Sequence, residues 1–225
     1  MRLTLATYNI HGCIGRDGIF DPDRILRVLH ELEADVIALQ EVDSREHRGL
    51  QVLQCLAAET GMTPIAGPTL LRHARDYGNA VMTRLKIREI RKLDLSLPLH
   101  EPRGALDIDL VCDGVNLQVV ATHLGLNPAE RRVQMQRLLE CFSTKHCVLM
   151  GDLNEWFLWG RPLRWLKGIF GRTLEIPTFP AFFPVFALDR IWVRPMSALI
   201  RLEVHHTGLA RKASDHLPLK ATIEI

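Results

Sequence analysis

The sequence lacks an uninterrupted apolar run long enough to span a bilayer. It also lacks a signal-peptide pattern at its start, because residues 3–10 alternate and carry Tyr8 and Asn9. The five cysteines are scattered and form no C-x-x-C pair, which indicates neither a disulfide framework nor a cysteine zinc site. We therefore expect a cytoplasmic protein with reduced cysteines.

A strong excess of charge of one sign is missing as well. The formal net charge is +2 and the sequence pI is about 8.3, whereas a tight nonspecific nucleic-acid binder is usually more basic. The 225 residues are 47% hydrophobic, which is enough for one full core. No repeat, low-complexity tract or linker divides them, so we expect one domain over residues 1–225 and a monomer.

Hydrophobic patterning predicts an α/β fold. Helices are expected over residues 22–33, 50–59 and 128–142, the first and last after the start signals Asp21-Pro22 and Asn127-Pro128. The turn Asp113-Gly114 predicts a hairpin. Helices and strands alternate early, hairpins follow and strands close the chain, which indicates mixed sheets covered by helices. The expected strands are residues 3–10, 35–40, 78–83, 87–95, 104–112, 115–123, 147–150, 188–193, 199–205 and 218–223.

Polar side chains stand at the ends of most of these strands. They comprise carboxylates, carboxamides and imidazoles, and no activated serine or cysteine is among them. Such a set suits a hard divalent cation and general acid–base work on an oxygen-rich substrate. Active sites of α/β folds also gather at strand ends. The residues are Asn9, Glu41, His123, Asp152, Asn154, Asp189, Asp215 and His216.

Each of these residues alone also fits a structural role. Asn9 suits an Asx turn, Glu41 a solvated acidic loop and His123 a core histidine bonded to backbone. Asp189 can pair with an arginine, and Asp215 can cap a turn. These readings do not explain why a chemically useful side chain recurs at nearly every strand end, so we interpret the set as one site.

The order of these residues resembles the motifs of the endonuclease/exonuclease/phosphatase superfamily. That superfamily includes deoxyribonuclease I-like nucleases, abasic-site endonucleases, inositol-phosphate phosphatases and neutral sphingomyelinases. The resemblance extends from residue 4 to about residue 224 and implies a four-layer α/β sandwich, in which two mixed sheets pack face to face with helices outside. The motifs are Thr7-Tyr8-Asn9-Ile10, Leu39-Gln40-Glu41-Val42, Ala121-Thr122-His123-Leu124, Gly151-Asp152-Leu153-Asn154, Leu188-Asp189-Arg190-Ile191 and Ser214-Asp215-His216-Leu217-Pro218.

The resemblance also implies a metal-dependent hydrolysis of a phosphoester. Glu41 would be the main ligand of Mg²⁺ or Mn²⁺. Asn9 and Asp215 would help directly or through water. The reaction would be in-line attack by a water molecule, with negative charge building on the phosphoryl oxygens.

The remaining motif residues would act on the water and on the phosphate. By the resemblance, Asp152 would orient or deprotonate the attacking water, and Asn154 would hold that water or a phosphate oxygen. His216, oriented by Asp189, would stabilise the developing charge or act as a base. His123 would lie near the leaving oxygen as an acid or hydrogen-bond donor.

Three segments bear on the substrate. Arg103, within residues 101–106, resembles an R-G-A element of the bacterial branch nearer sphingomyelinase and lipid-linked members, where it would bind phosphate; it also suits a plain strand entry. Residues 156–170 mix aromatics with arginines, which fits a phospholipid interface, base stacking or core packing. Residues 178–184 precede Asp189 and begin with a T-F-P element that resembles this branch, so Phe179 suits family packing. Phe182, Phe183 and Phe186 can line a pocket or an apolar rim.

The basic insertions that grip duplex DNA are not evident. We therefore expect a phosphodiester or phosphomonoester substrate other than duplex DNA, with a phospholipid among the candidates. A phospholipid substrate would place the protein peripherally at the inner membrane surface. A nuclease remains the alternative, followed by a catalytically silent binding module on the same fold.

Overall fold

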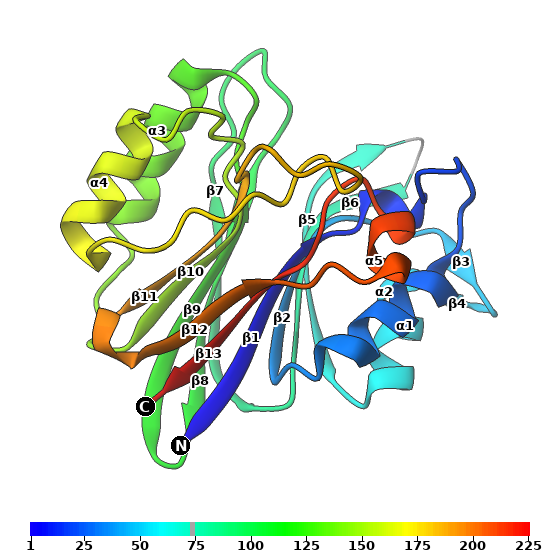
Figure 1. Ribbon diagram of the computed structural model, residues 1–225, viewed down its shortest axis with the longest axis horizontal. Helices are drawn as coiled ribbons and strands as arrows, with labels where there is room; N and C mark the ends of the chain where they lie inside the picture. The colour runs from blue at the N-terminus through cyan, green and yellow to red at the C-terminus, as the bar shows by residue number, and fades with distance from the viewer. Residues whose placement is uncertain (73–74) are drawn as a thin grey trace.

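Two facing β-sheets form the centre of the computed structural model, which describes residues 1–72 and 75–225 (Figure 1). The first sheet has six strands in the order β12-β13-β1-β2-β6-β5. Its β1 and β2 are parallel and its other pairs are antiparallel, so the sheet is mixed. The bounds are β1 Arg2–Asn9, β2 Val36–Asp43, β5 Thr63–Arg72, β6 Arg75–Thr83, β12 Leu199–Val204 and β13 Leu219–Glu224.

The second sheet has five strands in the order β11-β10-β9-β8-β7. Only β9 and β10 are parallel among its pairs, so this sheet is mixed too. A short hairpin of β3 (Glu46–His47) and β4 (Leu50–Gln51) lies apart. The five strands are β7 Lys86–Asp94, β8 Gly104–Cys112, β9 Val115–His123, β10 Cys147–Asp152 and β11 Asp189–Arg194.

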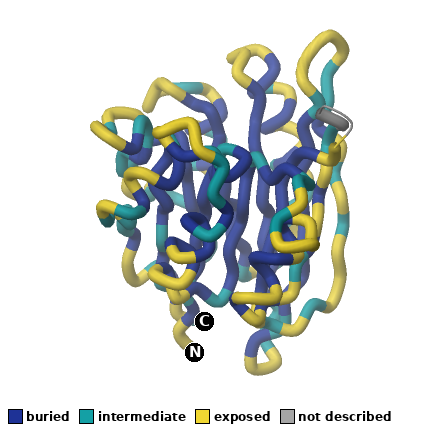
Figure 2. Tube along the Cα trace, turned by 90° about the vertical axis from the view of Figure 1, so that its right-hand side faces the viewer, coloured by how far each residue is buried: buried dark blue, intermediate teal, exposed yellow. Residues whose placement is uncertain are grey.

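The helices cover the outer faces of both sheets. One core cluster joins α1, α2 and α5 to the first sheet, and another joins α3 and α4 to the second. A third cluster fills the space between the sheets, and Figure 2 shows the resulting buried centre beneath exposed loops. The prediction of a four-layer α/β sandwich is confirmed. The helices are α1 Pro22–Leu32, α2 Val52–Thr60, α3 Pro128–Leu139, α4 Arg161–Phe170 and α5 Gly208–Ala213, with 3₁₀ turns at His11–Cys13 and Met196–Ala198.

Strand β2 shows how the sequence dictates the layers. Val36 and Ala38 belong to the core between the sheets, whereas Ile37 and Leu39 pack under α1 and α2. Because successive side chains leave a strand on opposite faces, a strand buried on both sides reads as a continuous apolar run. The apolar run before Gly151 has the same cause in β10.

Some elements differ from the sequence-based expectation. Strand β5 was not predicted, because Pro64, Gly67 and Pro68 interrupt its pattern; it lies at the sheet edge, where proline is tolerated. Helix α3 ends at Leu139 rather than near residue 142. Val133 of this helix is exposed although it is apolar.

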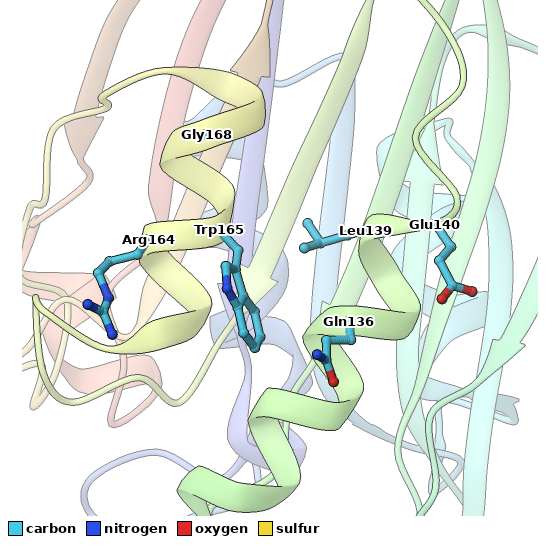
Figure 3. Close-up of a pocket in the computed structure, with 6 residues that line it drawn as sticks. All are labelled: Gln136, Leu139, Glu140, Arg164, Trp165 and Gly168. Carbon is cyan, nitrogen blue, oxygen red and sulfur yellow. The ribbon is translucent and has the colours of Figure 1, made fainter.

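Helix α4 occupies most of the aromatic and basic stretch at residues 156–170. It buries Leu163, Leu166 and Phe170 in the core against the second sheet and leaves Arg164 exposed. Helices α3 and α4 leave a shallow groove between them, into which Trp165 and Leu139 point (Figure 3). No helix within the described ranges has the length and apolarity to cross a membrane. All five cysteines are free thiols.

Candidate active site

Strand pairing in the second sheet brings three of the predicted residues side by side. Asp152, the last residue of β10, is in register with His123 on one neighbour and with Asp189 on the other. Directly paired residues place their side chains within contact distance on one face of a sheet. Nε2 of His123 lies 3.6 Å from Oδ2 of Asp152 as a result.

Asn9, at the end of β1, connects this group to the first sheet. Its Nδ2 donates to Oδ2 of Asp152 (3.2 Å) and to Oε1 of Glu41 (3.0 Å). Its Oδ1 accepts from the backbone N–H of His11 (3.1 Å). Glu41 lies in a bulge of β2 with a positive φ of 58°, a backbone strain that is characteristic of functional sites.

The Gly151-Asp152-Leu153-Asn154 turn has a specific backbone requirement. Gly151 has a φ of 144°, and a Cβ there would collide with the carbonyl oxygen of Thr122, so the strand pairing admits only glycine. Asn154 has a φ of 49°, and its backbone N–H donates to Oδ1 of Asp152 (2.9 Å). The turn thereby fixes the orientation of the Asp152 carboxylate, with Oδ2 facing Asn9.

A buried Asp–His pair lies on the other side of Asp152. Nδ1 of His216 donates to Oδ2 of Asp189 (2.8 Å), which also accepts from the Thr178 hydroxyl (2.6 Å). Burial alone would lower the pKa of His216, but the carboxylates of Asp189, Asp152 and Asp215 outweigh it and raise the pKa to about 10. The ring is therefore a cation at neutral pH, with Nε2 3.8 Å from Oδ2 of Asp152.

His123 has the opposite protonation state. Burial is the largest cause of a lowered pKa in His123, and the nearby charges of Arg103 and His216 lower it further. Asp152 raises it, but the net result is a pKa of about 3. Nη1 of Arg103 lies 3.2 Å from Nδ1, and Nδ2 of Asn154 lies 3.0 Å from Nε2. Both partners only donate, and a neutral imidazole can accept at one of its two nitrogens. The same Nδ2 of Asn154 also donates to the Leu124 carbonyl (2.9 Å).

Asp215 lies at the edge of this network. It is half-buried, and its Oδ1 is 3.9 Å from Nδ1 of His11. The hydroxyl of Ser214 donates to the backbone carbonyl of Asn9 (2.7 Å), which ties this segment to β1. Nη1 of Arg103, which the sequence predicts as a phosphate ligand or a strand-entry arginine, contacts His123 and lies 3.5 Å from Glu101.

Three supporting residues were not assigned a role from the sequence. Thr178 bonds Asp189, Ser214 bonds the Asn9 backbone, and the ring of Phe179 lies 4.7 Å from that of His216. Thr178 and Phe179 stand in an irregular segment, where no periodicity reveals which side chains face the site. The T-F-P element at Thr178 and the motif that contains Ser214 are the sequence signals for them.

Two sets of groups can hold a cation. Ligand atoms of Asp152, Asp189 and His216 all lie within 4.8 Å of one another. His216, however, is protonated and already donates to Asp189, which makes it a poor ligand. Glu41 and Asp152 instead present carboxylate oxygens on either side of the Asn9 amide, and hard cations prefer oxygen ligands. As oriented, Asn9 directs its nitrogen at these carboxylates.

Comparison with known proteins agrees with this geometry. The chain matches the model of the Endonuclease/Exonuclease/phosphatase family over residues 6–216. An alignment of 243 residues with the uncharacterized protein YbhP of Escherichia coli (strain K12) shows 31% identity and covers 98% of this chain and 96% of that protein.

Solved structures share the fold at lower identity. An endonuclease/exonuclease/phosphatase from Beutenbergia cavernae DSM 12333 superimposes with a TM-score of 0.83 at 20% identity, covering 100% of this chain and 72% of that one. A mannosyl-6-phosphatase from Bacteroides thetaiotaomicron VPI-5482 superimposes with a TM-score of 0.77 at 19% identity, covering 99% of this chain and 100% of that one. The chain belongs to the endonuclease/exonuclease/phosphatase family, whose members hydrolyse phosphoesters.

Proposed function

We propose that the protein is a divalent-metal-dependent phosphoesterase that hydrolyses a phosphodiester or phosphomonoester through in-line attack of an activated water. The observation that carries the proposal is the contact of one amide, that of Asn9, with carboxylates from both sheets. Around it lie a cationic imidazole, a neutral imidazole and a buried carboxylate. This combination supplies charge stabilisation, proton donation and proton acceptance at one place.

The metal is Mg²⁺ or Mn²⁺, with Glu41 as the main ligand and Asn9 and Asp215 assisting directly or through water. The bound ion neutralises charge on the phosphoryl oxygens and increases the acidity of water. The oxygen-rich donors Glu41 and Asp152 support the assignment of a hard cation. Asn9 would contribute its oxygen only after its amide rotates away from the His11 N–H.

Asp152 is the residue that orients the attacking water and accepts its proton. Oδ1 is held by the Asn154 N–H, and Oδ2, which accepts from Asn9, keeps a second lone pair for the water. The raised pKa of His216 makes it a charge-stabilising donor rather than a base, because it already carries its second proton at neutral pH. Asp189 maintains that charge and orients the ring.

His123 supplies the hydrogen-bond donor on the leaving-group side. We assign the ring proton to Nε2, so that Nδ1 accepts from Arg103 and the Asn154 amide turns its nitrogen away from Nε2. Arg103 is committed to that contact and is buried, which supports a positioning role more than direct phosphate binding. Asn154, beside His123, would hold the water or a phosphate oxygen.

The test is a substrate panel with a defined metal. The purified protein, stripped of metal, is assayed on bis-(p-nitrophenyl) phosphate, p-nitrophenyl phosphate, phospholipid vesicles, inositol phosphates and DNA, with and without Mg²⁺ or Mn²⁺. We expect turnover of at least one phosphoester that requires the metal and that Asp152→Asn lowers about 10²-fold or more. Hydrolysis confined to DNA would establish the nuclease alternative. Turnover of none of these substrates would favour a silent binding module.

A further inference from the structure

Exposed apolar side chains gather on two loops at the site end of the molecule. One loop connects β10 to α4 and the other precedes β11. Trp159 is 73% exposed and Phe183 is 68% exposed. A patch of this kind marks an interaction surface on a protein that is otherwise well packed. We name it the aromatic rim; it consists of Trp156, Phe157, Leu158, Trp159, Phe182, Phe183, Val185 and Phe186.

Trp156 and Phe186 join the two loops. The ring centroid of Trp156 is 4.8 Å from that of Phe186, so the first loop packs against the second. Within the first loop, the rings of Phe157 and Trp159 are 5.3 Å apart. These contacts pair Trp156 with Phe186 and Phe157 with Trp159 outside the core, so the exposure of these four rings is a property of the fold.

The rim borders the candidate active site. Trp156 also packs edge-on against Phe179 at 5.8 Å, and Phe179 lies 4.7 Å from the ring of His216. Whatever covers the rim therefore lies next to His216. A folded protein seated there would obstruct the approach of a phosphoester, whereas a phospholipid surface would bring phosphoesters to that same place.

Arginines flank the rim on both sides. The guanidinium of Arg16 lies 4.8 Å above the ring of Phe182. Arg161 and Arg164, at the start of α4, are exposed next to the Trp159 loop. None of these three has a carboxylate partner in the part of the chain that the structure describes. Tryptophan and arginine together at an apolar edge suit the boundary between acyl chains and anionic headgroups.

We propose that the aromatic rim docks on an anionic phospholipid bilayer and holds the active site against headgroup phosphoesters. The exposed aromatic rim and the arginines beside it are the observations that support docking. Its consequence for the substrate rests on the proposed phosphoesterase function. A second copy of this chain, or a soluble substrate with an apolar group, is the alternative occupant that the test distinguishes.

The test is co-sedimentation of the full-length protein with vesicles of phosphatidylcholine alone or mixed with phosphatidylglycerol. Wild-type protein should sediment with the mixed vesicles, and added salt should weaken the binding. Trp159→Ala and Phe183→Ala should each weaken it about tenfold, because each removes an aromatic side chain that the bilayer would bury. Ile200→Ala, which truncates an exposed apolar residue on β12, is the matched control and should sediment like wild type.

Two further variants separate the inference from a folding defect and from the proposed function. Trp159→Phe keeps an aromatic ring and should retain most of the sedimentation, while the vesicle-induced blue shift of tryptophan emission should shrink. Glu41→Gln should lose hydrolysis and still sediment. Failure of the phosphoesterase proposal would thus leave the vesicle result intact.

The inference would be overturned by wild-type protein that stays in solution with both vesicle types. Equal sedimentation of wild type and both alanine variants would overturn it too. So would light scattering that shows a dimer in solution which Trp159→Ala dissociates, because the rim would then be covered by a second copy.

Discussion

The Nδ2 atom of Asn9 lies 3.2 Å from Oδ2 of Asp152, although the two residues are 143 positions apart in the chain. Asn9 ends β1 of one sheet and Asp152 ends β10 of the other. The contact joins the two sheets at the same end of the sandwich. It also places the metal-binding and water-activating groups of the proposed reaction beside each other.

Replacing Asp152 should remove catalysis with little effect on the fold. Asp152→Asn keeps the shape of the side chain but cannot accept a proton, so we expect kcat to fall about 10²-fold or more on any active substrate. Asp109→Asn is the matched control, because Asp109 is also buried on a strand but pairs with Arg91 away from the site. Steady-state kinetics measures both, and equal activity of Asp152→Asn and wild type would contradict the role.

Asp189 should control the protonation of His216. In the metal-free protein, Asp189→Asn removes a hydrogen-bonded carboxylate, so the pKa of His216 should drop from about 10. A histidine pKa raised above about 6.5 stabilises the folded state fully below that pH and loses the contribution as the pH rises toward 10. NMR titration reports the pKa, and urea unfolding should show the gap between wild type and variant narrowing from pH 6 to 10.

Arg103 should set the tautomer and the neutrality of His123. Arg103→Met removes a positive charge that lowers the pKa of His123 and frees Nδ1, so that pKa should rise. The loss of the fixed Nε2 proton should reduce kcat about tenfold or more. Arg137→Met, which changes an exposed arginine of α3, should alter neither quantity. An unchanged His123 titration in Arg103→Met would count against the coupling.

Gly151 should tolerate no side chain. Gly151→Ala would place a methyl group against the Thr122 carbonyl at a positive φ, so unfolding free energy should fall by more than about 2 kcal/mol. Gly168→Ala is the control, because this α4 glycine has open space around it and should gain up to about 1 kcal/mol of helix stability. Chemical denaturation measures both variants. An unchanged unfolding free energy in Gly151→Ala would mean that the turn can relax and would contradict the prediction.

Much of this fold could be predicted because, in several elements, the local sequence signals agree with the structure that forms. Asp21 accepts from the Arg24 N–H and Pro22 opens α1, as the sequence indicates. The apolar runs of β2 and β10 become buried strands. Strand β5 escaped prediction because its prolines are tolerated only at an edge, and an edge position is a property of the whole sheet.

The sequence predicted which residues belong to the site, but not which of them contact each other or which are charged. Strand ends placed Asn9 and Asp152 among the candidates, while their contact depends on how two sheets pack. Burial lowers the pKa of both histidines; it prevails in His123, whereas the surrounding aspartates, Asp189 first, outweigh it in His216. Residues 156–170 combined two roles, an exposed loop and a core helix, that composition alone did not separate.

The central claim is that Glu41 anchors a divalent ion within this network. The most direct measurement is Mn²⁺ binding followed by electron paramagnetic resonance, with wild-type, Glu41→Gln and Glu46→Gln proteins compared at equal concentration. Glu46 is an exposed carboxylate in the nearby β3 hairpin and serves as the control. We predict saturable Mn²⁺ binding by wild type and Glu46→Gln, and binding weakened by about 10-fold or more in Glu41→Gln. Equal Mn²⁺ affinity in all three proteins, or none in wild type, would contradict the account.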